Sequence, residues 1–161
     1  MTAADGIKIE RVTGPTAEVQ ALIGELEAVL SAEYPPHQRH GLPLDAIFQP
    51  HIRFFLARLD GTAVGCGGVA LLDGFAELKR KYVRESLRGR GIAPALLVRL
   101  AAEARSAGRA MLRLETGDKQ AAAIRFYRRA GFRECGAFGD YARMTPDAIA
   151  TSVFMEKSLA P

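Results

Sequence analysis

The spacing of apolar residues divides the chain into helical and extended stretches. Apolar positions recur every three or four residues over 19–30, 92–108 and 120–130, which predicts three amphipathic helices. Short runs rich in apolar, β-branched and aromatic residues predict strands over 7–12, 53–59, 62–71, 75–83, 110–116, 132–135 and 152–157. Prolines over 35–43 cannot continue the first helix, so we expect a loop there and a short helix over 45–48.

The turns between these stretches predict how the strands connect. Asp60-Gly61 and Asp73-Gly74 are tight-turn sequences, so the three strands over 53–83 should pair in antiparallel order. The strand, helix and strand over 75–116 need a right-handed crossover, which makes those two strands parallel. We therefore predict an α+β fold, with a mixed, mostly antiparallel central sheet flanked by helices, in a single domain over residues 1–161.

The composition is that of a packed globular domain. The 161 residues are 48% hydrophobic and 25% charged, which favours a folded core over disorder. Residues 1–10 contain no apolar signal core, and the most apolar run, over 61–72, is too short to span a bilayer. We expect a cytoplasmic protein without a membrane partner.

The stretch Arg88-Gly89-Arg90-Gly91-Ile92-Ala93 stands at the start of the second predicted helix. Glycine permits positive φ angles and close approach of the backbone to a ligand, and the first amides of a helix lack intrahelical partners. These amides and the helix dipole favour a phosphate group. The net charge of +4 also concentrates here, at Lys79, Arg80, Lys81, Arg84, Arg88 and Arg90.

Other interpretations of this turn are less well supported. A dinucleotide-binding fold would have a glycine where Pro94 stands and an apolar strand before the turn, whereas the segment 79–88 is highly charged. Nucleic-acid binding through the basic cluster would use aromatic residues, and few lie nearby. A solvated basic rim is the remaining alternative. We predict no nucleic-acid partner.

Two motifs in sequence resemble those of the GNAT N-acetyltransferase superfamily. Arg88-x-x-Gly91-x-Ala93 matches the (Gln/Arg)-x-x-Gly-x-(Gly/Ala) coenzyme A motif of that family. The segment from Ala123-Ile124-Arg125-Phe126-Tyr127 to Gly131-Phe132 matches its second block. The resemblance covers residues 63–157 and implies a GNAT-like fold that transfers an acetyl group from acetyl-CoA to a primary amine by direct transfer.

The resemblance also implies which residues bind coenzyme A. The backbone of Tyr82 and Val83, at the end of the central strand, would pair with the pantetheine arm. The pyrophosphate would bind the amides of the turn, at Gly89, Arg90, Gly91, Ile92 and Ala93, with the charges of Arg88 and Arg90 beside them. Because Pro94 has no amide, the turn should use amides only up to Ala93. Gln120 stands where the family usually has an asparagine that contacts the cofactor.

In the same resemblance, Tyr127 matches the acid that protonates the leaving thiolate. The ordinary pKa values, about 10 for tyrosine and about 8.5 for a thiol, make this transfer uphill by about 2 kcal/mol, which leaves catalysis feasible. Glu77, eleven residues before Arg88, is the predicted base, and a solvent-facing strand residue is the alternative. Glu115 at the end of the next strand is a second candidate. A backbone amide near Val83 would stabilise the oxyanion.

The acceptor site is the least defined part of the sequence. Tyr34 and Tyr141 lie in loops and are the predicted acceptor-pocket residues, with loop anchoring as the alternative. The three histidines share no ligand spacing, so we predict no metal. The acceptor would be a small-molecule or peptide amine, and a homodimer is one assembly to consider. A coenzyme A sensor that keeps the fold and lacks catalysis is the alternative function.

Overall fold

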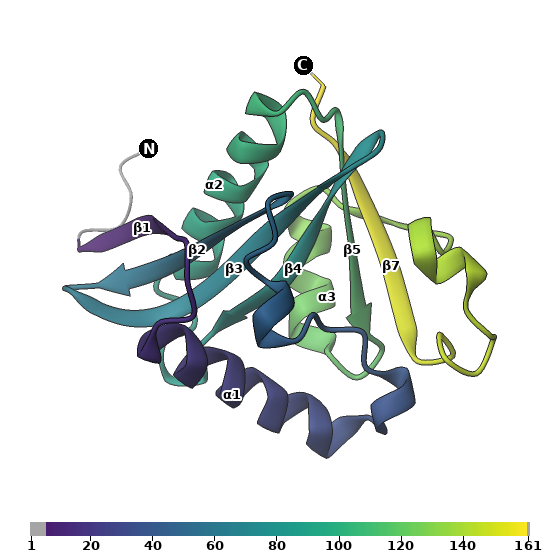
Figure 1. The fold of residues 1–161 in the computed structure, drawn as a ribbon, viewed down its shortest axis with the longest axis horizontal. Helices are drawn as coiled ribbons and strands as arrows, with labels where there is room; N and C mark the ends of the chain where they lie inside the picture. The colour runs from purple at the N-terminus through teal and green to yellow at the C-terminus, as the bar shows by residue number, and fades with distance from the viewer. Residues whose placement is uncertain (1–5, 161) are drawn as a thin grey trace.

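A seven-stranded mixed sheet with helices on both faces makes up the protein in the computed structural model, which describes residues 6–160 (Figure 1). The strand order is β1-β2-β3-β4-β5-β7-β6. The strands are β1 (Ile7–Val12), β2 (Ile52–Leu59), β3 (Thr62–Leu72), β4 (Phe75–Val83), β5 (Met111–Gly117), β6 (Arg133–Cys135) and β7 (Ser152–Ser158). All paired strands are antiparallel except β4 and β5, which confirms the α+β class and the predicted parallel pair.

Residues 1–5 and 161 lie outside the described residues. Both stretches belong to the single domain predicted over residues 1–161. Residues 1–5 are also part of the segment 1–10, in which we expect no signal core.

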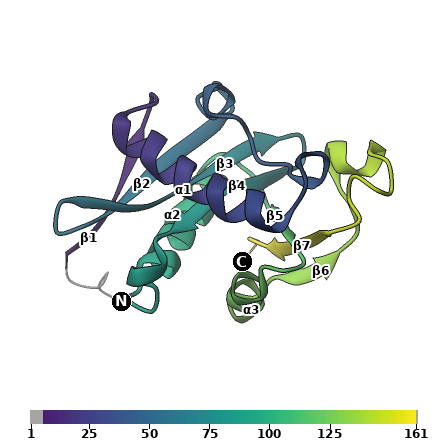
Figure 2. The same ribbon diagram turned by 90° about the horizontal axis from the view of Figure 1, so that it is seen from below.

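The helices lie close to where the apolar periodicity predicts them. They are α1 (Ala17–Glu33), α2 (Ile92–Ser106) and α3 (Ala121–Arg129). Figure 2 shows α1 on one face of the sheet and α2 and α3 on the other. The short helix expected over 45–48 is a 3-10 helix, Leu44–Ala46. None of the helices in residues 6–160 is long and apolar enough to cross a membrane.

Side chains of β2 alternate between these two faces and fix both helix layers. Phe54 packs with Leu22 of α1, whereas Phe55 packs with Leu96 of α2. The following turn is tight because Asp60 and Gly61 both take positive φ angles, 49° and 87°. Such a turn matches the twist of an antiparallel pair, so the predicted hairpin is confirmed.

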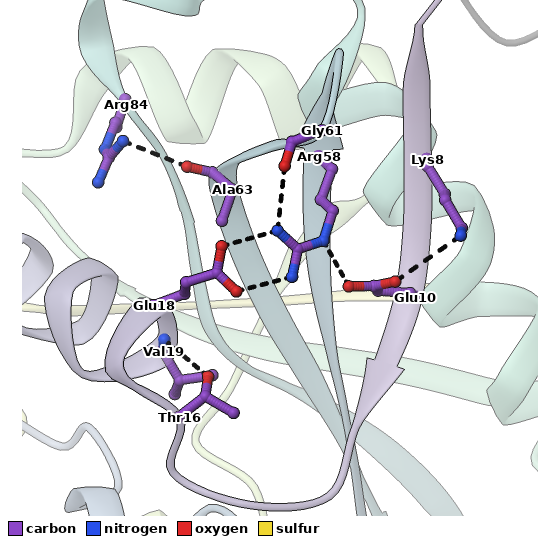
Figure 3. A network of polar contacts seen from close by, with 9 residues as sticks. All are labelled: Lys8, Glu10, Thr16, Glu18, Val19, Arg58, Gly61, Ala63 and Arg84. Carbon is purple, nitrogen blue, oxygen red and sulfur yellow. Dashed lines mark hydrogen bonds and ion pairs between the residues drawn. The ribbon is translucent and has the colours of Figure 1, made fainter.

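Polar contacts fix the start of α1 against the sheet (Figure 3). The Thr16 hydroxyl caps the helix by accepting a hydrogen bond from the Val19 amide at 3.3 Å. Arg58 on β2 donates to both carboxylate oxygens of Glu18, each at 2.7 Å, and also to Glu10 on β1. These contacts set the direction in which α1 crosses the sheet.

Strands β4 and β5 separate after a short parallel ladder. The ladder joins Ala76 to Leu112 and Glu77 to Arg113, whereas β4 continues to Val83 and β5 to Gly117. Figure 1 shows the two strands diverging towards their C-terminal ends, with α3 behind them. Beyond the ladder, the facing edges of both strands are free to bind other groups.

A β-bulge interrupts β4 beside β3. The register shifts by one residue between Lys79 and Tyr82, so Arg80 and Lys81 share one opposing residue, Gly67. Arg80 has a left-handed backbone conformation with φ 54°, which is uncommon for a residue that carries a side chain. Because the extra residue reverses the alternation of side chains, the bulge changes which face Arg80 and Lys81 contact.

Candidate active site

Two cavities meet where β4 and β5 diverge. The first, of about 160 Å³, is lined by β4, β5, α1 and the loop over 38–41. The second, of about 710 Å³, is lined by the end of β4, the glycine turn, the start of α2 and α3. The residues that line both are Leu26, Lys81, Gln120, Ala123 and Tyr127. The cavities therefore share a wall that contains Tyr127.

The glycine turn forms one end of the second cavity. Gly89 and Gly91 both take positive φ angles, 80° and 86°, and Gly91 is the N-cap of α2 without a side-chain cap. The first hydrogen bond of the helix runs from the Ala95 amide to the Gly91 carbonyl at 3.2 Å. The amides of Ile92 and Ala93 precede this bond, so they can donate to a ligand. Pro94 lies in the same first turn and interrupts no helical hydrogen bond.

Most of the predicted cofactor-binding residues line the second cavity. They are Tyr82, Val83, Arg88, Gly89, Gly91, Ile92, Ala93, Gln120 and Tyr127. Arg90 does not line it and is exposed. The Tyr82 hydroxyl turns to α1 and donates to Glu25 at 3.1 Å, so the side chain is held away from the turn.

Tyr127 is buried between aromatic neighbours. Its ring makes edge contacts with Phe126 and Phe132, with centroids 5.4 Å apart in each pair. Lys81 places its ammonium 5.3 Å from the Tyr127 ring and 4.3 Å from the Phe126 ring. Burial raises the pKa of Tyr127 above its ordinary value, so the hydroxyl stays protonated at neutral pH.

Glu77 lies in a buried polar cluster, which corrects the alternative that it faces solvent. Only 4% of the residue is exposed. Its carboxylate accepts a hydrogen bond from the Tyr141 hydroxyl at 2.7 Å and lies 2.9 Å from the Lys79 ammonium. Burial, followed by the charge of Glu77, raises the pKa of Tyr141. The structure thus brings the predicted base and one predicted acceptor-pocket tyrosine together at the first cavity.

Glu115 lines the same cavity from β5. It accepts a hydrogen bond from the Ser152 hydroxyl at 2.7 Å. Burial raises the pKa of Glu115, and the nearby Glu77 acts in the same direction, whereas Ser152 opposes the shift. Two carboxylates from the two diverging strands therefore line one cavity, and both remain candidates for a base.

Tyr34 lines the first cavity and also anchors a loop. Its hydroxyl accepts a hydrogen bond from the Lys119 amide at 2.8 Å, which ties the end of α1 to the segment before α3. Gly117 makes this possible, because a Cβ there would overlap the Tyr34 ring. The expected anchoring function and the expected position at the cavity therefore occur in the same residue.

Other residues of the first cavity were not assigned to the acceptor site one by one from the sequence. Lys79, Arg80 and Lys81 were expected only as part of the basic cluster beside the glycine turn, and Gln38, Arg39 and His40 come from the loop expected over 35–43. The His40 ring lies 2.7 Å from the Ala148 carbonyl and contacts the Tyr141 ring edge-on. Three consecutive basic residues of β4 interrupt the alternation of apolar and polar residues along the strand. This interruption is the feature of the sequence that could have indicated the bulge. Within residues 6–160 no group of three or more potential metal ligands is found.

The glycine turn lies at the N-terminus of α2, beside the diverging strands β4 and β5, where the resemblance to the GNAT superfamily puts the coenzyme A pyrophosphate. The comparison with known families agrees with that resemblance. The acetyltransferase (GNAT) family model matches residues 23–132, so the chain belongs to this family. The match begins well before residue 63, where the recognised resemblance starts. The predicted family and the predicted enzyme class, an N-acetyltransferase, are therefore confirmed.

Individual relatives cover nearly the whole chain. An IAA acetyltransferase from Azospirillum brasilense is 45% identical over 143 residues, which is 88% of this chain and 90% of that protein. The crystal structure of a candidate acyl-CoA N-acyltransferase from Klebsiella pneumoniae is 36% identical, with a TM-score of 0.75 over 96% of this chain and 98% of that one. A PaiA N-acetyltransferase from Thermoplasma acidophilum, in complex with coenzyme A, is 16% identical, with a TM-score of 0.68 over 94% and 98%. This last likeness concerns the fold alone.

Proposed function

We propose that the protein transfers an acetyl group from acetyl-CoA to a primary amine by direct transfer, with both substrates bound together. The observation that carries this proposal is the meeting of the two cavities at Tyr127. A donor in the second cavity and an acceptor in the first would face each other beside one side chain. Transfer would then need no covalent enzyme intermediate.

The second cavity suits the chemistry of acetyl-CoA. The glycine turn offers the amides of Ile92 and Ala93 and the positive end of the α2 dipole to a pyrophosphate. Arg88 adds a charge at the same place. The backbone of Tyr82 and Val83 lies on the part of β4 that has left β5, so it can pair with the amides of a pantetheine arm.

In the reaction, the amine nitrogen attacks the thioester carbonyl carbon, the C–N bond forms and the C–S bond breaks. A backbone amide near Val83 would stabilise the oxyanion. Tyr127 would give its proton to the leaving thiolate. Burial raises the pKa of Tyr127, but the thiolate leaves into the same buried surroundings, which also raise the proton affinity of sulfur. The transfer therefore stays within reach of a general acid.

The proton lost by the amine would go to Glu77. Its hydrogen bond from Tyr141 and its ion pair with Lys79 hold the carboxylate in one place at the first cavity. A lysine-like amine needs about 4.6 kcal/mol to become neutral at pH 7, whereas an α-amine needs about 1 kcal/mol. The contribution of a base should therefore depend on the amine. Glu115 is the alternative base at the same cavity.

The test is turnover with a panel of acceptors. Purified protein is mixed with acetyl-CoA and small primary amines, short peptides or IAA, since the Azospirillum relative is an IAA acetyltransferase. Released thiol and product mass are measured. We expect thiol release that depends on an amine, and initial-rate lines that intersect, as a ternary complex requires. Parallel lines would contradict direct transfer. Coenzyme A binding by calorimetry without turnover of any acceptor would favour a sensor.

A further inference from the structure

A buried arginine in the first cavity has a hydrogen-bond donor without an acceptor. The Arg80 side chain is 4% exposed, and its Nε has no partner in the described part of the chain. Nε of Arg39, which lines the same cavity, also lacks one among these residues. Arginine stays charged at neutral pH, and a buried charged donor without a partner costs more than a neutral one. The two guanidinium groups, whose residues line the cavity, therefore have unused hydrogen-bonding capacity for an acceptor atom from a ligand.

The β4 bulge is what turns Arg80 into this cavity. On a regular strand Arg80 would follow Ala76 and Leu78, which pack in the core beneath α2. The bulge instead places Arg80 against α1, where its Nη2 pairs with Glu27. The left-handed φ of 54° is a strained conformation for arginine. Strain of this kind clusters at active sites, ligand clamps and switch regions.

The loop over 38–41 leaves room for the guanidinium. Gly41 lines the cavity, and a Cβ at this position would overlap Nη1 of Arg80. Gly41 does not have a positive φ, so its backbone does not require glycine. The need for a small residue here therefore comes from the space that Arg80 occupies.

The charges of the cavity favour an anion on this side. Glu27 is shared, because Nη1 of Arg39 lies 3.6 Å from its second oxygen. One partly exposed carboxylate therefore faces two guanidinium groups. The charged residues that line the cavity are four cations, Arg39, Lys79, Arg80 and Lys81, and two carboxylates, Glu77 and Glu115. Lys79 is paired with Glu77. Arg39 and Arg80 have only the Glu27 carboxylate between them, so an excess of positive charge remains beside these two arginines.

We propose that the acceptor carries a carboxylate as well as its amine, and that Arg80, assisted by Arg39, binds this carboxylate. The acceptor class is a small amino acid or a similar zwitterion. This proposal rests on the proposed function and narrows its substrate class. The guanidinium groups donate to the carboxylate oxygens, and Glu77 and Glu115 lie on the same cavity to receive the amine.

The test compares acids with their carboxamides. Glycine, β-alanine, L-serine and L-phenylalanine are each paired with the corresponding amide. Binding to the protein saturated with coenzyme A is measured by calorimetry, and kcat/KM is measured with acetyl-CoA. We expect at least one acid to exceed its amide by about tenfold or more, the range of a charge-assisted hydrogen bond.

Variants assign the preference to the site. Arg80→Met should bring the ratio of acid to amide, in binding and in kcat/KM, down to about one. Arg53→Met, at an arginine that pairs with Glu103 away from both cavities, should keep the wild-type ratio. Gly41→Ala should reduce the ratio without removing any charge. Gly14→Ala, with no atom within 4 Å, is its matched control. Thermal unfolding of each variant shows that it folds.

The outcomes separate this proposal from the proposed function. Tighter binding of an acid without any turnover would support the carboxylate site and contradict the transferase. Turnover of amines with no acid exceeding its amide in binding or rate would overturn the carboxylate site and leave the transferase standing. An acid preference that survives both Arg80→Met and Gly41→Ala would also overturn it. The wild-type ratio of acid to amide can refute the proposal by itself, so the test still stands if a variant does not fold.

Discussion

The two cavities that meet at Tyr127 are built from different kinds of group. The second cavity offers backbone amides from one short stretch, the glycine turn and the start of α2. The first offers charged side chains from the loop over 38–41, β4 and β5, beside apolar residues of α1 and Tyr141 of the 3-10 helix Gly139–Arg143. A backbone site needs particular residues at fixed spacings, because few residues permit its φ angles. A side-chain site needs only that the fold bring its members together.

This difference between the two cavities explains why the family motif marks the donor site and not the acceptor site. The turn at Gly89 and Gly91 is recognisable because its geometry restricts the sequence. The acceptor side has no such restriction, so Arg39 and Arg80 are separated by some forty residues in the chain and join only through a bulge and a loop. Donor chemistry can therefore be shared across a family while acceptor chemistry varies.

The largest expected effect comes from breaking the backbone site. Gly91→Val puts a β-branched residue at φ 86°, which strains the turn and blocks approach to its amides. We expect the affinity for coenzyme A, measured by calorimetry, to fall by about a hundredfold or more. Gly74→Val is the matched control, since Gly74 has φ 81° in a turn with no atom within 4 Å. Retained affinity in Gly91→Val would place the phosphates elsewhere.

The same contrast separates what the sequence predicts about the fold from what it does not. Tight turns and helix periodicity are local, so the Asp60-Gly61 hairpin and all three helices were predicted. The insertion of β7 between β5 and β6 depends on long-range pairing that no local pattern encodes. The bulge at Arg80 is also non-local, because it depends on how β4 meets β3. Alternation on a regular strand therefore assigns Arg80 and Lys81 to the wrong faces.

The candidate site follows the same division. The residues predicted to bind the cofactor line the second cavity, apart from the exposed Arg90. Burial of Glu77 was not predictable from its neighbours, because Tyr141, which donates to its carboxylate, is 64 residues away in the chain and meets it only after folding. The basic run over 79–81 also does not form the solvated rim considered from the sequence. Arg80 is buried against α1, and Lys81 lies over the rings of α3.

The second prediction concerns the shared wall. Tyr127→Phe should lower kcat by about a hundredfold, because the general acid is lost while the ring contacts remain. Coenzyme A affinity should stay close to that of the wild type. Since burial raises the pKa of Tyr127, the wild-type rate should not fall through ionisation of this group up to about pH 10. Tyr34→Phe, which loses the bond from the Lys119 amide, should affect stability more than kcat. Unchanged kcat in Tyr127→Phe would exclude it as the acid.

A third prediction sharpens the function of the acceptor side. Glu77→Gln keeps the volume of the side chain and an acceptor for the Tyr141 hydroxyl, but removes the charge. We expect kcat/KM to fall by about tenfold or more for a lysine-like amine and by less for an α-amine, because the former needs more help to become neutral. Glu115→Gln is measured in parallel. If the larger loss occurs in Glu115→Gln, the base lies on β5 rather than on β4.

The smallest expected effect concerns Lys81, which lines both cavities. Burial, followed by the charge of Arg88, lowers the pKa of Lys81 from 10.5 to about 8. Below that pH the folded protein holds a disfavoured charge, so its stability should rise as the pH increases from about 8 to 10.5. Lys81→Met should therefore exceed the wild type in unfolding free energy by about 1–2 kcal/mol near pH 7, and this difference should vanish near pH 10.5. Urea unfolding measures it, with Lys8→Met, at a side chain 73% exposed, as the control. A difference that does not change with pH would mean that packing, not charge, distinguishes Lys81.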